Sequence, residues 1–161
     1  MKVSDRINYI SNWIDNYAKK NSDKVFNLVV GVSGGIDSAV TSTLCAKTKL
    51  RTIVVSLPIR QNKIQHSLSL MHINWLKLNF HNVEAHDVNL DNIFKIFENT
   101  MKEFKSELAF ANARSRLRMM TLYQIAQSNN ALVVGTGNKV EDFGIGFYTK
   151  YGDGGVDISP L

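Results

Sequence analysis

Several features that often reveal a protein's class are scarce in this sequence. It contains one cysteine, Cys45, and two prolines, and no apolar run approaches the roughly 20 residues that span a bilayer. A single cysteine excludes an intrachain disulfide and a metal site built from several cysteines. The N-terminus, from Met1 to Ile14, lacks the continuous apolar stretch of a secretory signal. We therefore expect a cytoplasmic protein without a membrane partner.

The net charge of the chain is also modest. There are 19 Lys and Arg residues against 14 Asp and Glu residues, which gives a net charge of +5. This excess suits an anionic ligand but is too small to indicate nucleic-acid binding. With 161 residues, 44% of them hydrophobic, the chain is long enough for one domain with a sizeable core and too short for two ordinary ones. We expect a single domain over residues 1–161.

Short apolar segments alternate with longer segments in which apolar residues recur every three or four positions. This alternation predicts βαβ units, and hence an α/β fold with a doubly wound parallel sheet and helices on both faces. In such sheets, ligands bind beyond the carboxyl ends of the strands, where both glycine-rich segments of this sequence lie. The predicted strands are Phe26–Val30, Thr52–Leu57, Val83–Val88 and Ala131–Val134, and the predicted helices are Val3–Tyr17, Ile36–Lys47, Gln65–Leu78, Leu90–Phe104 and Leu108–Ala126.

The first glycine-rich segment has the composition of a phosphate-binding loop. Its glycines let backbone N–H groups approach an anion, and the helix that follows adds free N–H groups and the positive end of its dipole. Ser33 and Ser38 supply hydroxyl donors. Asp37 would repel a bare phosphate, so a cation such as Mg²⁺ is expected between them. The predicted ATP-phosphate site comprises Gly31, Val32, Ser33, Gly34, Gly35, Ile36, Asp37 and Ser38.

Other interpretations of this segment exist. It is not a Walker A loop, because no Gly-Lys-Ser/Thr follows. Gly31, Ser33 and Gly35 fit the nucleophile elbow of α/β-hydrolases, which requires a later acid and a later histidine. The last histidine, however, is His86. A tight turn in which Asp37 merely caps a helix is a further alternative.

Four stretches resemble known families. Ser33–Ser38 resembles the PP-loop of the ATP pyrophosphatase superfamily, which cleaves ATP to AMP and pyrophosphate and has the adenine nucleotide alpha hydrolase-like fold. Gly135–Glu141 and Gly146–Gly155, with Asp157 after them, resemble the NAD synthetase signature, and Asn112–Met119 resembles it as well. Since no glutaminase-like domain precedes these motifs, the sequence resembles the ammonia-dependent form.

The resemblance implies a ligase that amidates deamido-NAD with ammonia, giving NAD, AMP and pyrophosphate through an adenylylated intermediate. It also implies Mg²⁺ as cofactor, ATP as co-substrate and a homodimer. The family continues well beyond the position of Leu161, so we expect this ATP-binding domain to be incomplete at its C-terminus. The carried-over site residues are Gly31–Ser38 and Thr136 for ATP, Asp37 and Glu141 for the metal, and Arg116, Lys150 and Asp157 for deamido-NAD; the catalytic residue that activates ammonia stays unassigned.

The chain also departs from the family pattern. It carries one extra residue between Glu141 and Gly146, and Leu57–Gln61 matches the adenine-side loop too poorly to assign Arg60 or Gln61. Without the resemblance, the arginines at positions 114, 116 and 118 would be taken for a solvated helix face. Another PP-loop ligase and a non-catalytic fragment remain alternative functions.

Overall fold

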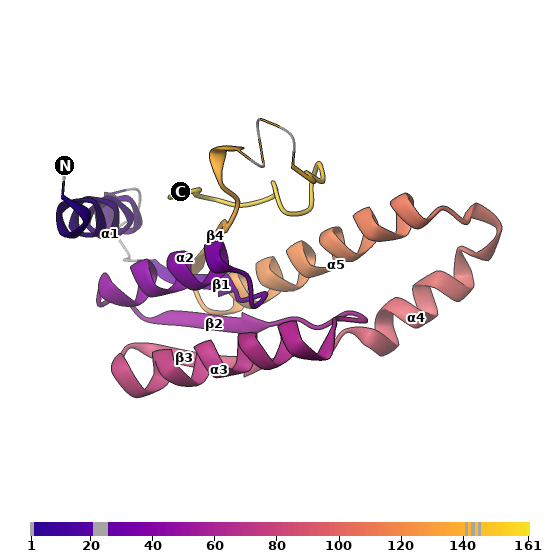
Figure 1. The fold of residues 1–161 in the computed structure, drawn as a ribbon, viewed down its shortest axis with the longest axis horizontal. Coiled ribbons are helices and arrows are strands. Elements are labelled where there is room, and N and C mark those ends of the chain that lie inside the picture. The colour runs from indigo at the N-terminus through magenta and orange to yellow at the C-terminus, as the bar shows by residue number, and fades with distance from the viewer. Residues whose placement is uncertain (1, 21–25, 141, 143, 145) are drawn as a thin grey trace.

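The computed structural model describes residues 2–20, 26–140, 142, 144 and 146–161 (Figure 1). Within these residues, no helix has the length and apolar character needed to cross a membrane. The helices are α1 (Val3–Lys20), α2 (Ile36–Lys47), α3 (Lys63–Asn79), α4 (Asp91–Thr100) and α5 (Glu107–Ser128), with a short 3₁₀ turn η1 (Lys102–Phe104). The strands are β1 (Asn27–Gly31), β2 (Thr52–Ser56), β3 (Val83–Asp87) and β4 (Ala131–Val134).

The strands of the described part form one parallel sheet in the order β3-β2-β1-β4. The chain therefore builds outward from β1 to β3 and then crosses to the other side of β1 to form β4. Val30 of β1 pairs with Val54 of β2 and with Val134 of β4. Because the direction of winding changes between β1 and β4, the loops after these strands diverge and leave a crevice, which is where open α/β sheets bind ligands.

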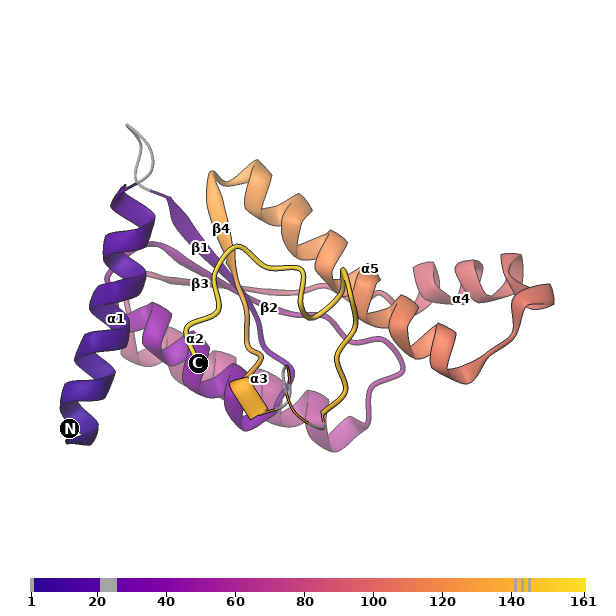
Figure 2. The same ribbon diagram turned by 90° about the horizontal axis from the view of Figure 1, so that it is seen from above.

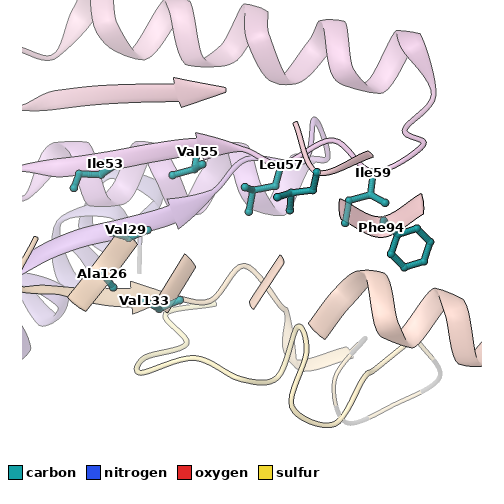
Figure 3. Packing of buried hydrophobic residues seen from close by; sticks show 9 residues of the cluster. Val29, Ile53, Val55, Leu57, Ile59, Phe94, Ala126 and Val133 are labelled. Atoms are coloured by element: carbon teal, nitrogen blue, oxygen red, sulfur yellow. The ribbon is translucent and has the colours of Figure 1, made fainter. Parts of the chain in front are cut away.

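Side chains of successive strand residues pack on opposite faces of the sheet. Val29, Ile53 and Val55 belong to a cluster that includes residues of α4 and α5, drawn in Figure 3. Leu28 and Val30 pack instead with residues of α1 and α2, and a third cluster joins β2 to α2 and α3. The doubly wound sheet with helices on both faces is thereby confirmed, and Figure 2 shows α5 on the opposite side of the strands from α2 and α3. Val29, Ile53 and Val55 are fully buried, and so are Leu28 and Val30, because helices cover both faces of the sheet.

One predicted helix is wrong in its length. The segment Leu90–Phe104 was expected to be continuous, but α4 ends at Thr100 and a separate 3₁₀ turn follows. The Thr100 hydroxyl donates to the Ile96 carbonyl at 3.0 Å, and the Met101 N–H donates to the Phe97 carbonyl at 3.0 Å. The Met101 bond is the last regular one of α4; at Met101 the backbone leaves the helical conformation, with φ −94° and ψ 21°, and α5 starts after the Ser106 cap.

Candidate nucleotide-binding cleft

The glycine-rich loop after β1 joins the sheet directly to the N-terminus of α2. The Val32 N–H donates to the Val55 carbonyl at 2.8 Å, which holds the start of the loop in line with the sheet. Gly35 precedes α2 with an extended backbone, and within the described part no side chain caps this helix. The first N–H groups of this 12-residue helix, at the end of the loop, therefore favour an anion.

Gly34 is the residue of the loop whose backbone excludes a side chain. Its φ is +89°, a conformation that L residues rarely adopt. A Cβ placed there would overlap the Gln65 carbonyl oxygen and lie 3.2 Å from the Ser69 nitrogen, both of them backbone atoms of α3. The loop can therefore lie directly on α3 only because position 34 is glycine.

Hydroxyl groups brace the loop from inside. The buried Ser38 hydroxyl donates to the Gly35 carbonyl at 2.8 Å and accepts from the Ser33 N–H at 3.2 Å. One turn later, Ser42 donates to the Ser38 carbonyl at 2.7 Å and lies 3.0 Å from His72 Nε2 on α3. Burial lowers the pKa of His72, although a bond to a backbone carbonyl of α2 acts in the opposite direction. Among the described residues, Ser33 has no imidazole bonded to it, which disfavours the hydrolase elbow.

The loop after β4 contacts Asp37 in the first turn of α2. Asn138 Nδ2 donates to Asp37 Oδ2 at 3.1 Å, across 101 positions of sequence. The Asp142 carboxyl packs against Gly137. Burial raises the pKa of Asp142, and the charges of Asp153 and Asp37 raise it further, so these three carboxyls share one acidic region. The predicted metal ligand at position 141 lies outside the described residues.

The segment from Tyr148 to Gly155 is fastened to one face of α5. Thr149 Oγ1 donates to Asn112 Oδ1 at 2.7 Å, and Ser115 Oγ donates to Asp153 Oδ1 at 2.6 Å. The Asp153 carboxylate also accepts the Thr149 N–H at 3.1 Å, which closes the turn between them. Arg116 Nε donates to the Lys150 carbonyl at 3.1 Å. Positions 112, 115 and 116 are three and four residues apart, and that spacing places them on one helix face.

These loops surround a cleft of about 610 Å³ between the strand ends and α5. Of the predicted ATP residues, Gly31, Val32, Ser33 and Thr136 line it. Several lining residues were not assigned from the sequence. Arg60 donates a backbone N–H to Asp91 and forms a two-pronged ion pair with Glu98. Gln61 Nε2 donates to the Ser33 carbonyl at 2.6 Å and so ties the loop after β2 to the loop after β1.

Two further lining residues are the arginines at positions 114 and 118. Both are partly buried, so the solvated helix face considered for the three arginines holds only for Arg116, which is exposed. The i, i+4 spacing of the two half-buried arginines was available in the sequence. The direction of that helix face was not, because it depends on how α5 packs against the sheet.

The residues carried over for deamido-NAD lie around the cleft rather than in it. Lys150 Nζ stacks over the Tyr151 ring at 5.0 Å, next to the Arg116 contact described above. Asp157 fastens the sheet edge, because its carboxylate accepts the Val133 N–H at 2.8 Å and the Tyr123 hydroxyl at 3.1 Å. Burial and the Asp157 charge raise the pKa of Tyr123 to about 12. The roles of these residues toward substrate stay predictions.

The sequence matches the family model described as NAD synthase over residues 6–161. The NH(3)-dependent NAD(+) synthetase of Mesoplasma florum is 37% identical, over all of this chain and 64% of the relative. The protein of the same name from Saccharolobus solfataricus is 41% identical, over 96% of this chain and 53% of the relative. The chain thus spans about half to two thirds of the length of these two relatives.

Solved structures agree with the sequence matches. The NMN synthetase of Francisella tularensis superposes with a TM-score of 0.88 at 33% identity, over all of this chain and 65% of that one. The NH3-dependent NAD synthetase of Campylobacter jejuni, determined with a nitrate ion, gives a TM-score of 0.87 at 29% identity, over 100% of this chain and 67% of that one.

A parallel, doubly wound sheet with a glycine-rich loop and a helix N-terminus at its switch point defines an α/β protein with the fold of the PP-loop type. The chain belongs to the NAD synthase family, whose model matches all but its first five residues.

Proposed function

We propose that this chain carries the ATP site of a ligase that converts deamido-NAD and ammonia to NAD. The observation that carries the proposal is the meeting of two loops at the switch point. There the N-terminus of α2 is uncapped within the described part, and Asn138 of the second loop donates to Asp37 in the first turn of α2. The names of the curated relatives and their identity over nearly the whole chain supply the reaction.

In the proposed reaction, a carboxylate oxygen of deamido-NAD attacks the α-phosphorus of ATP. The bond between the α-phosphorus and the bridging oxygen breaks, and pyrophosphate leaves. Ammonia then attacks the acyl carbon and loses a proton, and the carbon–oxygen bond to AMP breaks. Gly31–Ser38 would bind the phosphates with backbone N–H groups and the α2 dipole, which stabilise the charge that develops on pyrophosphate. Thr136, on the cleft wall, would contact ATP as well.

The acidic region suits Mg²⁺ as cofactor. Magnesium prefers oxygen ligands and commonly takes one or two carboxylates, phosphate oxygens and waters. Among the described residues, no group of three Asp, Glu, His or Cys side chains is placed to hold a metal ion. Asp37 would hold the ion, with Glu141 proposed as the second carboxylate. When bound, Mg²⁺ would neutralise phosphate charge and make pyrophosphate a better leaving group.

A second acceptor follows from the Francisella tularensis match. That structure is an NMN synthetase, so the mononucleotide deamido-NMN is an alternative acceptor of the same chemistry. Arg116 and Lys150, which meet at the loop fastened to α5, are proposed to contact the acceptor, together with Asp157. Both acceptors carry the nicotinate carboxylate that becomes the amide and differ in the nucleotide part beyond it.

The test is an assay of the purified 161-residue chain with ATP, Mg²⁺ and ammonium. Deamido-NAD, deamido-NMN or no acceptor is added, and AMP and the amide product are measured. Equal amounts of AMP and NAD support the proposal. AMP formation with deamido-NMN alone reassigns the acceptor, and AMP formation only with an unrelated acid would indicate another PP-loop ligase. ATP binding without turnover would show that the chain is a non-catalytic fragment.

Asp37→Ala tests the metal role, with Asp5→Ala as a matched control. Both aspartates lie in the first turn of a helix, but Asp5 is exposed on α1, away from the cleft. We expect Asp37→Ala to abolish the part of ATP affinity that depends on Mg²⁺ and Asp5→Ala to leave it unchanged. Equal Mg²⁺-dependent affinity in all three proteins would refute the metal role.

We also propose a homodimer. Ile93, Ile96, Phe104 and Leu108 are each more than half exposed and lie on α4, on η1 and at the start of α5. This segment projects beyond the strands in Figure 2. Exposed apolar side chains along one projecting segment favour a protein contact. Sedimentation velocity of the wild type and Ile96→Asp tests this: a dimer is expected for the first and a monomer for the second, and monomers in both cases would contradict it.

A further inference from the structure

Arg114 and Arg118 lie one turn apart on α5 and line the cleft together. They are far along the chain from the glycine-rich loop and come from the helix on the other face of the sheet (Figure 2). A phosphate bound at the N-terminus of α2 would therefore contact a different element from a phosphate bound by the two arginines. The two arginines form a cationic part of the cleft, and the glycine-rich loop forms a separate part that is rich in N–H donors.

Both guanidinium groups are held in place before any ligand binds. Arg118 Nε donates to the Leu57 carbonyl at 3.0 Å, which anchors one nitrogen and leaves the two terminal nitrogens for another partner. The Arg114 guanidinium carbon lies 5.6 Å from the centre of the Phe94 ring, within cation–π distance. Phe94 is itself buried, so this platform is rigid.

Neither guanidinium group forms an ion pair within the described part of the chain. Arg60, which lines the same cleft, forms its ion pair with Glu98, whereas no carboxylate lies within 4.0 Å of the charged nitrogens of Arg114 or Arg118. Burial lowers the pKa of Arg118, and the neighbouring Arg114 charge lowers it further, while Asp91 opposes this effect. Two partly buried like charges on adjacent turns repel each other, and an anion between them would relieve that repulsion.

We propose that Arg114 and Arg118 form a second anion subsite of the cleft, which takes a phosphate group of a bound nucleotide. The inference rests on the proposed function, which supplies two nucleotides with phosphates. Arginine presents paired N–H donors that match two phosphate oxygens, and it stays charged when partly buried. The cleft, at about 610 Å³, falls within the usual range of small-molecule sites. The phosphate belongs either to ATP or to the acceptor, and the experiment separates these sources.

The experiment measures binding by calorimetry to the wild type, Arg114→Met, Arg118→Met and Arg118→Lys. The titrants are ATP with Mg²⁺, pyrophosphate, deamido-NAD, deamido-NMN and uncharged adenosine. Methionine keeps much of the side-chain length and removes the charge. Arg51→Met is the matched control, because Arg51 pairs with Glu84 on the surface. Urea unfolding of each variant checks the fold. If Arg118→Met does not fold, the binding results for Arg114→Met decide the test.

We expect each methionine variant to bind at least one phosphate-bearing titrant about tenfold to a hundredfold more weakly, since a charged hydrogen bond is worth that much. Adenosine affinity should stay within about twofold, and Arg118→Lys should recover part of the loss, because lysine keeps the charge without the paired donors. The titrant that loses affinity identifies the source of the phosphate.

Two results would overturn the subsite. One is unchanged affinity of both methionine variants for all four phosphate-bearing titrants, and the other is an equal loss for adenosine. If the wild type forms the amide while these variants bind as it does, only the subsite fails. If the wild type binds none of the four titrants, the proposed function fails with it.

Discussion

Replacing Gly34 by alanine should separate the loop from α3. The alanine Cβ would overlap the Gln65 carbonyl. The backbone would either keep a φ of +89°, which is strained for alanine, or move to another conformation. A non-glycine residue in such a backbone region costs about 1–3 kcal/mol, and an overlap with a backbone atom cannot be relieved by a side-chain rotation. We expect Gly34→Ala to lower the free energy of unfolding by about 2–4 kcal/mol, the strain plus the displacement of the loop.

Gly35→Ala is the matched control for this substitution. Its backbone is extended, and a Cβ there would meet only the Ser33 hydroxyl, at 3.4 Å. Its expected cost is below about 1 kcal/mol, the difference between glycine and alanine at a helix N-cap. Urea unfolding followed by circular dichroism gives both values, and calorimetry with ATP gives the affinity, which should fall at least about tenfold for Gly34→Ala because the loop moves. Equal stability losses in the two variants would refute the role of the α3 contact.

Two further predictions concern a polar contact between α2 and α3 and a polar contact at the edge of the sheet. Because the pKa of His72 is lowered in the fold, the unfolded chain binds more protons near the ordinary histidine pKa of about 6.5, so stability should fall as the pH drops through that value. His72→Asn should flatten this dependence between about pH 7.5 and 5.5, and an unchanged slope in urea titrations would contradict the assignment. Tyr123→Phe removes the hydroxyl that donates to Asp157 and should lower the free energy of unfolding by about 1 kcal/mol. Tyr9→Phe, at an exposed position, should have no measurable effect, and equal losses in the two variants would argue against the Tyr123 contact.

The strands and both glycine-rich loops were predictable because their signals are local. Short apolar segments such as 27–31 and 131–134 end directly at glycine, and the alternation with helices fixes a parallel sheet. The strand order also follows, in part, from the two glycine-rich loops, since ligand loops gather at a switch point. The end of α4 was not predictable in this way, because the helix ends at the Met101 cap without a proline or glycine, where only the backbone conformation changes.

The cleft was only partly predictable. Glycine and aspartate at a strand end have a direct chemical meaning, so Gly31–Ser38 could be proposed as a phosphate-binding segment, of which Gly31, Val32 and Ser33 line the cleft. The cationic wall could not, because the direction of a helix face depends on packing. Arg118 faces the cleft because α5 lies against the Val29 face of the sheet, whereas Arg116, two positions earlier, is exposed. Asp157 likewise looks like a ligand residue in sequence, and its contacts with the sheet edge become visible only once β4 is placed.

The most direct measurement follows an oxygen atom. Deamido-NAD with ¹⁸O in its nicotinate carboxylate is incubated with the 161-residue chain, ATP, Mg²⁺ and ammonium, and AMP is analysed by mass spectrometry. Adenylation moves one carboxylate oxygen to phosphorus, and cleavage of the carbon–oxygen bond by ammonia leaves it there. We expect one ¹⁸O in each AMP and an equal amount of NAD. Unlabelled AMP, or ADP and phosphate in its place, would contradict the adenylylated intermediate and with it the proposed reaction.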